Sequence, residues 1–225
     1  AQDASNGHRK RVAFNGTQTW PPAQRTYDYQ KAVYEGVQIG CPGMQVIGPV
    51  LALPQGYPLF DYAGSYVGGS YLNAVGALGI FTYTDIVAIH VYRDNNNSWQ
   101  VAASSANRIM ANYGASAKKL IINETSTTGS GVFATTSTAT EEMDKAIWFM
   151  TNYSQMAELN VERADWHTFM KYTTSTFQFS AFANDLSTLP VSNAMGIFNT
   201  VGSSSTWIRS RNDGTLNIQE FRRSS

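Results

Sequence analysis

Lys-Lys-Leu-Ile-Ile-Asn-Glu-Thr-Ser-Thr-Thr, residues 118–128, is the stretch that decides the fold. Its centre, Leu-Ile-Ile at residues 120–122, is apolar and includes two β-branched isoleucines, which predicts a strand that is buried on both faces. The apolar run ends at Glu124, where a loop of small hydroxyl residues begins. A carboxyl group at the rim of an apolar core can have its pKa tuned by desolvation, which favours a functional role. The competing interpretation is that Glu124 is only the first solvated residue of a loop.

The same strand pattern recurs along the chain, and a helical pattern separates each strand from the next. Strand centres are expected near Ala13, Gly48, Ala88, Ile121 and Trp166. Helices are expected over residues 26–40, 65–81, 99–113 and 140–160. This alternation predicts an α/β protein with a parallel sheet covered by helices, either doubly wound or a TIM-barrel-like (β/α) barrel. We favour the barrel because no strand is followed by a glycine-rich phosphate-binding motif.

The residues that end these strands should meet, because the carboxyl ends of all strands in a parallel barrel line one face. The residues expected around this mouth are Asn15, Leu53, His90, Tyr92, Glu124 and Trp166. Asp165 and His167 flank Trp166 on the opposite face of the alternating strand. We expect these two side chains to turn toward the helices or to pair with each other.

The composition limits the kinds of partner that the protein can bind. Lys plus Arg and Asp plus Glu number 16 each, and charged residues make up only 14%. No overall field would therefore attract nucleic acid or an anionic membrane, and we expect neither as a partner. We expect a neutral partner instead. Aromatic residues reach 12%, with five Trp and twelve Tyr, which suits a carbohydrate, although most of these rings will fill the core.

Cys41 is the sole cysteine, which excludes an intrachain disulfide and thiolate metal clusters. No His, Asp or Glu grouping has metal-ligand spacing, so we expect no metal and no cofactor. No apolar run approaches the roughly 18 residues needed to span a bilayer. The chain starts without the apolar core of a signal peptide. Ala1 fits a mature terminus left by cleavage, hence our expectation of a secreted or extracellular protein, although an intracellular protein would look the same.

With 225 residues and 43% hydrophobic content, the chain can bury one substantial core, and we expect a single domain over 1–225. Residues 1–10 are polar and predict a flexible arm. Residues 171–225 form a tail that completes or caps the barrel. Within it the pattern predicts a helix over 191–200 and a closing strand over 216–221.

Several short motifs along the chain occur in an order that indicates a family resemblance. They are Phe-Asn-Gly at 14–16, Cys-Pro-Gly-Met-Gln-Val-Ile-Gly-Pro at 41–49, Asp-Ile-Val-Ala-Ile-His-Val-Tyr at 85–92, Leu-Ile-Ile-Asn-Glu-Thr at 120–125 and a late strand Trp at 166. In this order they resemble the second half, strands four to eight, of the clan A (β/α)8-barrel retaining glycoside hydrolases. The resemblance covers about residues 11–170. It implies a partial barrel of about five βα units.

The resemblance also implies roles for individual residues. Glu124, at the end of the seventh strand of the family pattern, looks like the nucleophile. His90 and Tyr92 look like groups that hydrogen-bond the nucleophile or the sugar, and Trp166 looks like the platform under the sugar. Asn15 would serve the sugar 2-hydroxyl.

Two features depart from the family pattern. A retaining mechanism needs a second carboxyl group, roughly 5 to 5.5 Å from the first, as acid/base. The family carries it in an Asn-Glu pair, and the matching pair here is Asn15-Gly16, so the acid/base position looks vacant. Asp61, in the loop after the second strand, is a candidate replacement. In addition, a barrel of about five units leaves open sheet edges, which self-association as a homo-oligomer, a second chain or a rebuilt tail would have to close.

Three functional hypotheses remain open. The first is a retaining glycoside hydrolase that acts on a β-linked neutral polysaccharide or glycoside, impaired by the missing acid. The second is a glycan-binding protein without turnover, and the third is a structural protein that assembles through its sheet edges. Ancestry favours the hydrolase, whereas loss of an acid commonly costs orders of magnitude in rate.

Overall fold

The fold is a parallel sheet with helices, seen in a computed structural model. It describes residues 12–14, 18–20, 23–51, 67–92, 99–127, 138–168, 180–183, 187–202, 205–212 and 217–223. The expected arm at residues 1–10 lies outside this part of the chain. None of the described helices has the length and apolarity needed to cross a bilayer.

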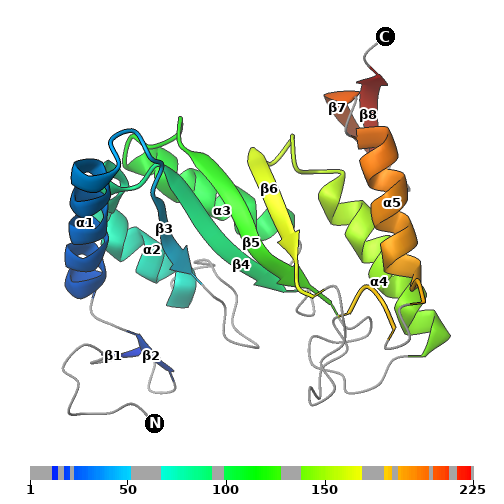
Figure 1. Ribbon diagram of the computed structural model, residues 1–225, viewed down its shortest axis with the longest axis horizontal. Helices are drawn as coiled ribbons and strands as arrows, with labels where there is room; N and C mark the ends of the chain where they lie inside the picture. Colours follow the sequence, from blue (N-terminus) through cyan, green and yellow to red (C-terminus); the bar gives the residue numbers. More distant parts are fainter. Residues whose placement is uncertain are drawn as a thin grey trace. The chain divides into compact units, whose positions relative to one another are not determined.

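Four parallel strands form the central sheet (Figure 1). They are β3 (Ile47–Leu51), β4 (Ile86–Tyr92), β5 (Lys119–Ser126) and β6 (Val161–Trp166), in the order β3-β4-β5-β6. The strands thus follow one another in the sheet as they do in the sequence. This order is that of a (β/α) barrel, since a doubly wound sheet reverses its order at a switch point. The predicted α/β, TIM-barrel-like class is confirmed for this part of the barrel.

The strand expected around Ala13 forms outside the parallel sheet. β1 (Val12–Phe14) pairs antiparallel with β2 (Gln18–Trp20), with Val12 opposite Trp20. Only three residues separate the two strands in sequence. Such a short connection allows antiparallel pairing, whereas a parallel neighbour needs a crossover of about a dozen residues or more. The described parallel sheet therefore holds four strands rather than the five that were expected.

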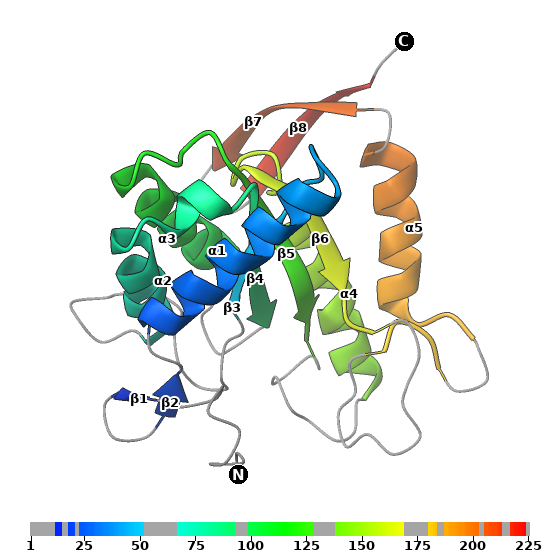
Figure 2. The ribbon, with the colours of Figure 1, turned by 60° about the vertical axis from the view of Figure 1, so that its left-hand side comes forward.

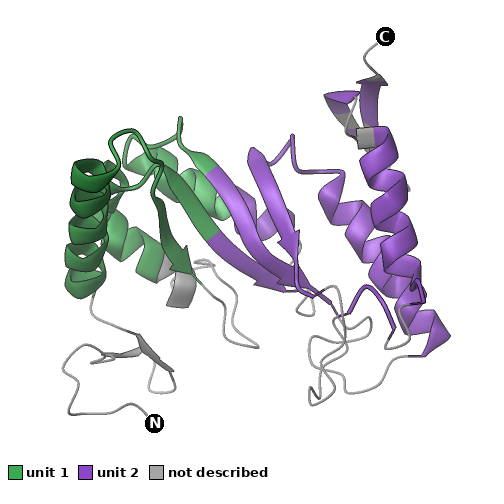
Figure 3. Cartoon of the chain, viewed as in Figure 1, with its two compact units in different colours: residues 1–88, 105–119 green, residues 89–104, 120–225 purple. Residues whose placement is uncertain are grey.

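The chain divides into two compact units, residues 1–88 with 105–119 and residues 89–104 with 120–225 (Figure 3). The sequence had suggested a single domain. The first unit contains α1 (Ala23–Gly40), α2 (Val67–Ala77) and a 3-10 turn at Ile80–Tyr83. Its core includes fully buried apolar side chains on α2 and the 3-10 turn: Leu72, Val75 and Ile80.

The second unit contains α4 (Ala139–Tyr153) and α5 (Pro190–Gly202), which pack against each other (Figure 2). α4 begins where the acidic first turn predicted it, and a capping box fixes its start. The hydroxyl of Thr138 accepts the Glu141 N–H at 3.3 Å, and the Glu141 carboxylate accepts the Thr138 N–H at 2.6 Å. Two of the free donors at the helix start are satisfied in this way.

The core of the second unit holds a layer of aromatic side chains. We call this set the aromatic layer: Trp99, Trp148, Phe149, Tyr153, Trp166 and Phe198. The closest rings, Phe149 and Tyr153, stack with centroids 4.0 Å apart. Such ring pairs contribute about 0.5–1.5 kcal/mol each beyond their buried area. The layer therefore ties the helices α3 (Trp99–Asn112), α4 and α5 to β6.

The C-terminal tail forms the expected helix and strand, and adds one more strand. α5 covers the predicted helix at 191–200. The predicted strand at 216–221 is β8 (Asn217–Arg223), which pairs antiparallel with β7 (Ser205–Asn212). These two strands make a sheet of their own, so the described tail adds no strand to the parallel sheet.

Candidate active site

Three of the residues expected at the mouth come together at the ends of β4 and β5, all within the second unit. His90 Nδ1 lies 3.3 Å from Glu124 Oε2. The Tyr92 hydroxyl donates a hydrogen bond to Glu124 Oε1. Each carboxylate oxygen therefore has its own partner, which fixes the orientation of the carboxylate. His90 and Tyr92 reach it together because residues two apart on a strand share a face.

A β-bulge in β5 sets the direction of the Glu124 side chain. Ile122 lies opposite Ala164 on β6, and Thr125 lies opposite Trp166, so three steps along β5 match two along β6. The extra residue falls between Ile122 and Thr125, in the stretch that contains Glu124. Bulges of this kind redirect side chains and are frequent next to active sites.

Thr125 anchors the strand end beside Glu124. Its buried hydroxyl donates to the Val91 carbonyl oxygen of β4 at 2.5 Å and accepts from Trp99 Nε1 of α3 at 3.1 Å. The backbone N–H of Trp99 donates to Asn152 Oδ1 of α4 at 3.0 Å. Sequence reasoning missed Thr125 and Trp99. A signal was present in a hydroxyl residue next to the candidate nucleophile and a Trp at the start of a helix.

Trp166 lies on the helix side of the sheet. The residue is 8% exposed, and its ring meets Trp148 and Phe149 edge to face, with centroids 6.1 and 5.8 Å away. Thr125, its neighbour across the sheet, also faces the helices, and side chains in register share a face. Glu124, adjacent to Thr125, turns to the other side. The structure thus brings Glu124, His90 and Tyr92 together and places the Trp166 ring in the aromatic layer, away from the expected mouth.

Asn15 and Leu53, the other two residues expected at the mouth, lie outside the described residues. So do Gly16, the vacant acid/base position, and Asp61, its candidate replacement. Within the described part of the chain, no second carboxyl group contacts Glu124 or His90. The described residues also contain no group of three or more His, Cys, Asp and Glu side chains that could hold a metal ion.

The electrostatics of the site keep Tyr92 protonated and His90 weakly basic. Burial raises the pKa of Tyr92 far above its ordinary value, and the hydrogen bond to Glu124 and its negative charge raise it further. Burial lowers the pKa of His90, Glu124 opposes this shift, and His167 adds to it. Tyr92 therefore remains a hydrogen-bond donor, and His90 is neutral near pH 7.

Of the two residues that flank Trp166, Asp165 forms an ion pair with Arg163, Oδ2 to Nη2 at 2.9 Å. The His167 N–H donates to the Thr125 carbonyl oxygen at 2.9 Å and so holds the end of β6 against β5. His167 also lies close enough to His90 to influence its pKa.

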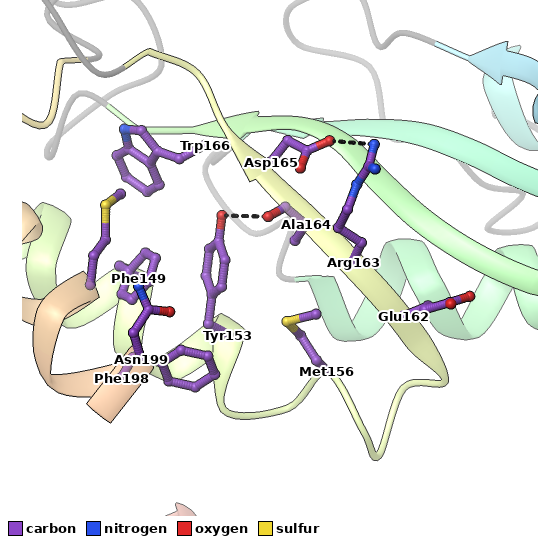
Figure 4. Close-up of a pocket in the computed structure, with 11 residues that line it drawn as sticks. Phe149, Tyr153, Met156, Glu162, Arg163, Ala164, Asp165, Trp166, Phe198 and Asn199 are labelled. Atoms are coloured by element: carbon purple, nitrogen blue, oxygen red, sulfur yellow. Dashed lines mark hydrogen bonds and ion pairs between the residues drawn. The ribbon is translucent and has the colours of Figure 1, made fainter. Parts of the chain in front are cut away.

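A pocket of about 390 Å³ lies elsewhere in the second unit, between α4, β6 and α5 (Figure 4). Its lining is aromatic and thioether on the helix side and charged along β6: Phe149, Tyr153, Met156, Glu162, Arg163, Ala164, Asp165, Trp166, Met195, Phe198 and Asn199. Glu124, His90 and Tyr92 are not among the residues that line it.

Solved structures with a similar fold are glycoside hydrolases. A glucosidase from Croceicoccus marinus matches with a TM-score of 0.61 and 18% identity, over 84% of this chain and 38% of that one. A family 39 glycoside hydrolase from Bacteroides cellulosilyticus WH2 matches with a TM-score of 0.60 and 15% identity, over 88% and 42%. The GH39 enzyme from Xanthomonas axonopodis pv. citri matches with a TM-score of 0.56 and 15% identity, over 85% and 40%.

These matches bear on the fold. At such identities the likeness shows the fold alone, and the chain spans about two-fifths of the length of the three structures. The resemblance to the clan A glycoside hydrolases is confirmed at this level, as a glycoside hydrolase-like fold of which the chain covers part. No family model and no curated protein matches the sequence.

Proposed function

We propose that this protein is a glycoside hydrolase of the retaining clan A type, which acts on or binds a neutral polysaccharide or glycoside. The observation that carries the proposal is the carboxylate of Glu124, held on one oxygen by Tyr92 and on the other by His90. The three similar structures, a glucosidase and two glycoside hydrolases by name, support an O-glycosyl bond as the target. A polymeric glycan also fits a secreted protein, which we include in the proposal.

In this proposal Glu124 is the nucleophile. One carboxylate oxygen attacks the anomeric carbon as the bond from that carbon to the leaving-group oxygen breaks, which gives a covalent glycosyl-enzyme and the released aglycone. Water then attacks the anomeric carbon, frees the carboxylate and gives the sugar with retention of configuration. Its side chain is 33% exposed, so a substrate can reach it. Tyr92 donates to the carboxylate and keeps its orientation between turnovers. Neutral His90 supports the second oxygen without a full positive charge, which would weaken the nucleophile.

The acid/base role is unfilled in this proposal, because the matching family position is Gly16. A leaving group that departs without protonation avoids this step, and azide can attack the glycosyl-enzyme without a general base. We therefore expect dinitrophenyl β-glycosides to be hydrolysed, faster with azide, and unactivated aryl glycosides to be hydrolysed feebly. Glu124→Gln should abolish both reactions. Undiminished turnover by Glu124→Gln would refute the assignment of the nucleophile.

The alternative is glycan binding without turnover, which the glycine at position 16 favours. Soluble glucans, mannans and galactans should then change Trp fluorescence with saturation, in Glu124→Gln as well as in the parent protein. A panel without any response would count against both the hydrolase and the binding function.

A further inference from the structure

His167 lies one residue beyond the end of β6, and its backbone continues the pairing of that strand. Thr125 on β5 lies opposite Trp166 on β6. The His167 N–H donates to the Thr125 carbonyl oxygen at 2.9 Å, as in the hydrogen-bond ladder of a parallel pair. The alternation of side chains along β6 therefore extends to His167.

This alternation turns His167 and Glu124 to the same face of the sheet. Trp166 packs against Phe149 of α4, and Thr125 accepts the hydrogen bond of an indole N–H on α3, so both side chains face the helices (Figure 4). Glu124 precedes Thr125, and His167 follows Trp166. Neighbouring residues on a strand point to opposite faces, which directs Glu124 and His167 away from the helices.

His90 occupies this same face on the other side of Glu124. Its Nδ1 lies 3.3 Å from Glu124 Oε2. Because β5 lies between β4 and β6, His90 approaches the carboxylate from one neighbouring strand and His167 lies at the end of the other. His167 also lowers the pKa of His90, which agrees with two imidazoles on one face of the sheet. All three residues belong to the second unit.

We propose that His167 completes the Glu124 site from β6, where it takes the place expected for Trp166 and acts as a positioning residue for the carboxylate. The placement follows from the strand geometry, whereas the role rests on the proposed hydrolase function. A protonated His90 would hold Glu124 Oε2 in an ion pair and weaken it as a nucleophile. Positive charge on His167 opposes that protonation, so the carboxylate keeps its negative charge available for attack.

The sign of this effect can be stated because the charges near His90 are few. Near the carboxyl ends of the described strands, the ionisable residues are Tyr92 on β4, Glu124 on β5, and Arg163, Asp165 and His167 on or just after β6. β3, the other neighbour of β4, has no ionisable residue. Arg163 and Asp165 pair with each other, and Tyr92 keeps its proton because its pKa is raised. Glu124 raises the pKa of His90, and His167 lowers it.

A charge series at position 167 tests the placement without any substrate. The chain has only three histidines, so nuclear magnetic resonance can follow the titration of each ring, and His90→Gln identifies the signal of His90. His167→Gln removes the charge and should raise the pKa of His90. His167→Lys supplies a permanent positive charge and should not raise it. Far-UV circular dichroism checks that both variants fold. An unchanged His90 titration in His167→Gln, or an equal rise in both variants, would overturn the proposal.

The pH dependence of turnover then tests the role separately. Protonation of His90 should lower kcat/KM on a dinitrophenyl β-glycoside at low pH. The acid limb of the pH profile should therefore move to higher pH in His167→Gln and should not do so in His167→Lys. An acid limb that stays in place while the pKa of His90 rises would refute the positioning role. A parent protein that shows the expected titrations but hydrolyses no glycoside would refute the proposed hydrolase function and still support the placement of His167.

Discussion

Tyr92 shows how one phenol can set the behaviour of a carboxylate. Its raised pKa keeps the proton on the hydroxyl at neutral pH and well above it, so Tyr92 remains the donor in the hydrogen bond to Glu124 there. A hydrogen bond to a charged group contributes about 1.5–3 kcal/mol. Tyr92 therefore contributes much of the free energy that fixes the orientation of the Glu124 carboxylate.

At this scale, Tyr92→Phe should lower kcat/KM on an activated aryl glycoside by about 10- to 100-fold, because it removes one of the two partners of the carboxylate. Tyr113→Phe is a matched control, since it removes a hydroxyl bonded to Asn73 Oδ1 at 3.0 Å in the other unit. An effect of equal size in the two variants would show that Tyr92 acts only through stability.

Thr125 gives a second test at the level of single residues. Thr125→Val keeps the shape but removes the hydroxyl, and leaves the indole N–H of Trp99 buried without this acceptor. The free energy of unfolding should fall by about 1–3 kcal/mol, measured by urea denaturation. Thr125→Ser keeps the hydroxyl and should lose less. Equal losses would assign the cost to packing.

Single residues also mark what the sequence could and could not predict. Glu124, His90 and Tyr92 were found because each ends an apolar run, and parallel strands bring such ends to one edge. The orientation of Trp166 was not predictable in this way. The pairing of β5 and β6 shifts by one residue between Leu120 and Ile121 and shifts back between Ile122 and Thr125. Each such shift exchanges the two faces of a strand locally, and simple alternation does not foresee it.

At the level of elements, the helices and central strands lie where the sequence predicts them, since their periodicity and start signals are local, although α4 ends at Tyr153 and the predicted helix ran to 160. β1 departs from the prediction, because it pairs with β2 instead of joining the parallel sheet. Only three residues separate the two strands, and a strand's own residues do not determine which strand it pairs with. The same holds for β8, which was expected as a closing strand and pairs with β7.

The start of α4 offers a test of an element. Thr138→Ala removes the hydroxyl that caps the helix and should lower the free energy of unfolding by about 1 kcal/mol, seen as a lower urea midpoint. Thr138→Ser retains the capping oxygen and should stay close to the parent. Similar losses in both variants would mean that the cap contributes little.

At the scale of the whole molecule, His90 links stability to pH. Burial lowers its pKa in the folded state, so below about pH 6.5 the unfolded chain takes up a proton first. Stability should therefore fall as the pH drops from about 7 toward the lowered pKa of the folded state, and be free of this penalty above about pH 7. His90→Gln should show a shallower loss over the same window in urea denaturation. Parallel pH curves for parent and variant would contradict a buried, weakly basic His90.

The division into two units has a consequence for dissecting the protein. The second unit takes residues 89–104 from the middle of the first, so each unit is built from chain segments that alternate along the sequence. No single cut separates them: a fragment that ends at residue 88 lacks 105–119, and one that starts at residue 120 lacks 89–104. The lost piece of the second unit carries His90 and Tyr92. A fragment that starts at residue 120 would thus keep Glu124 and lose both partners of its carboxylate.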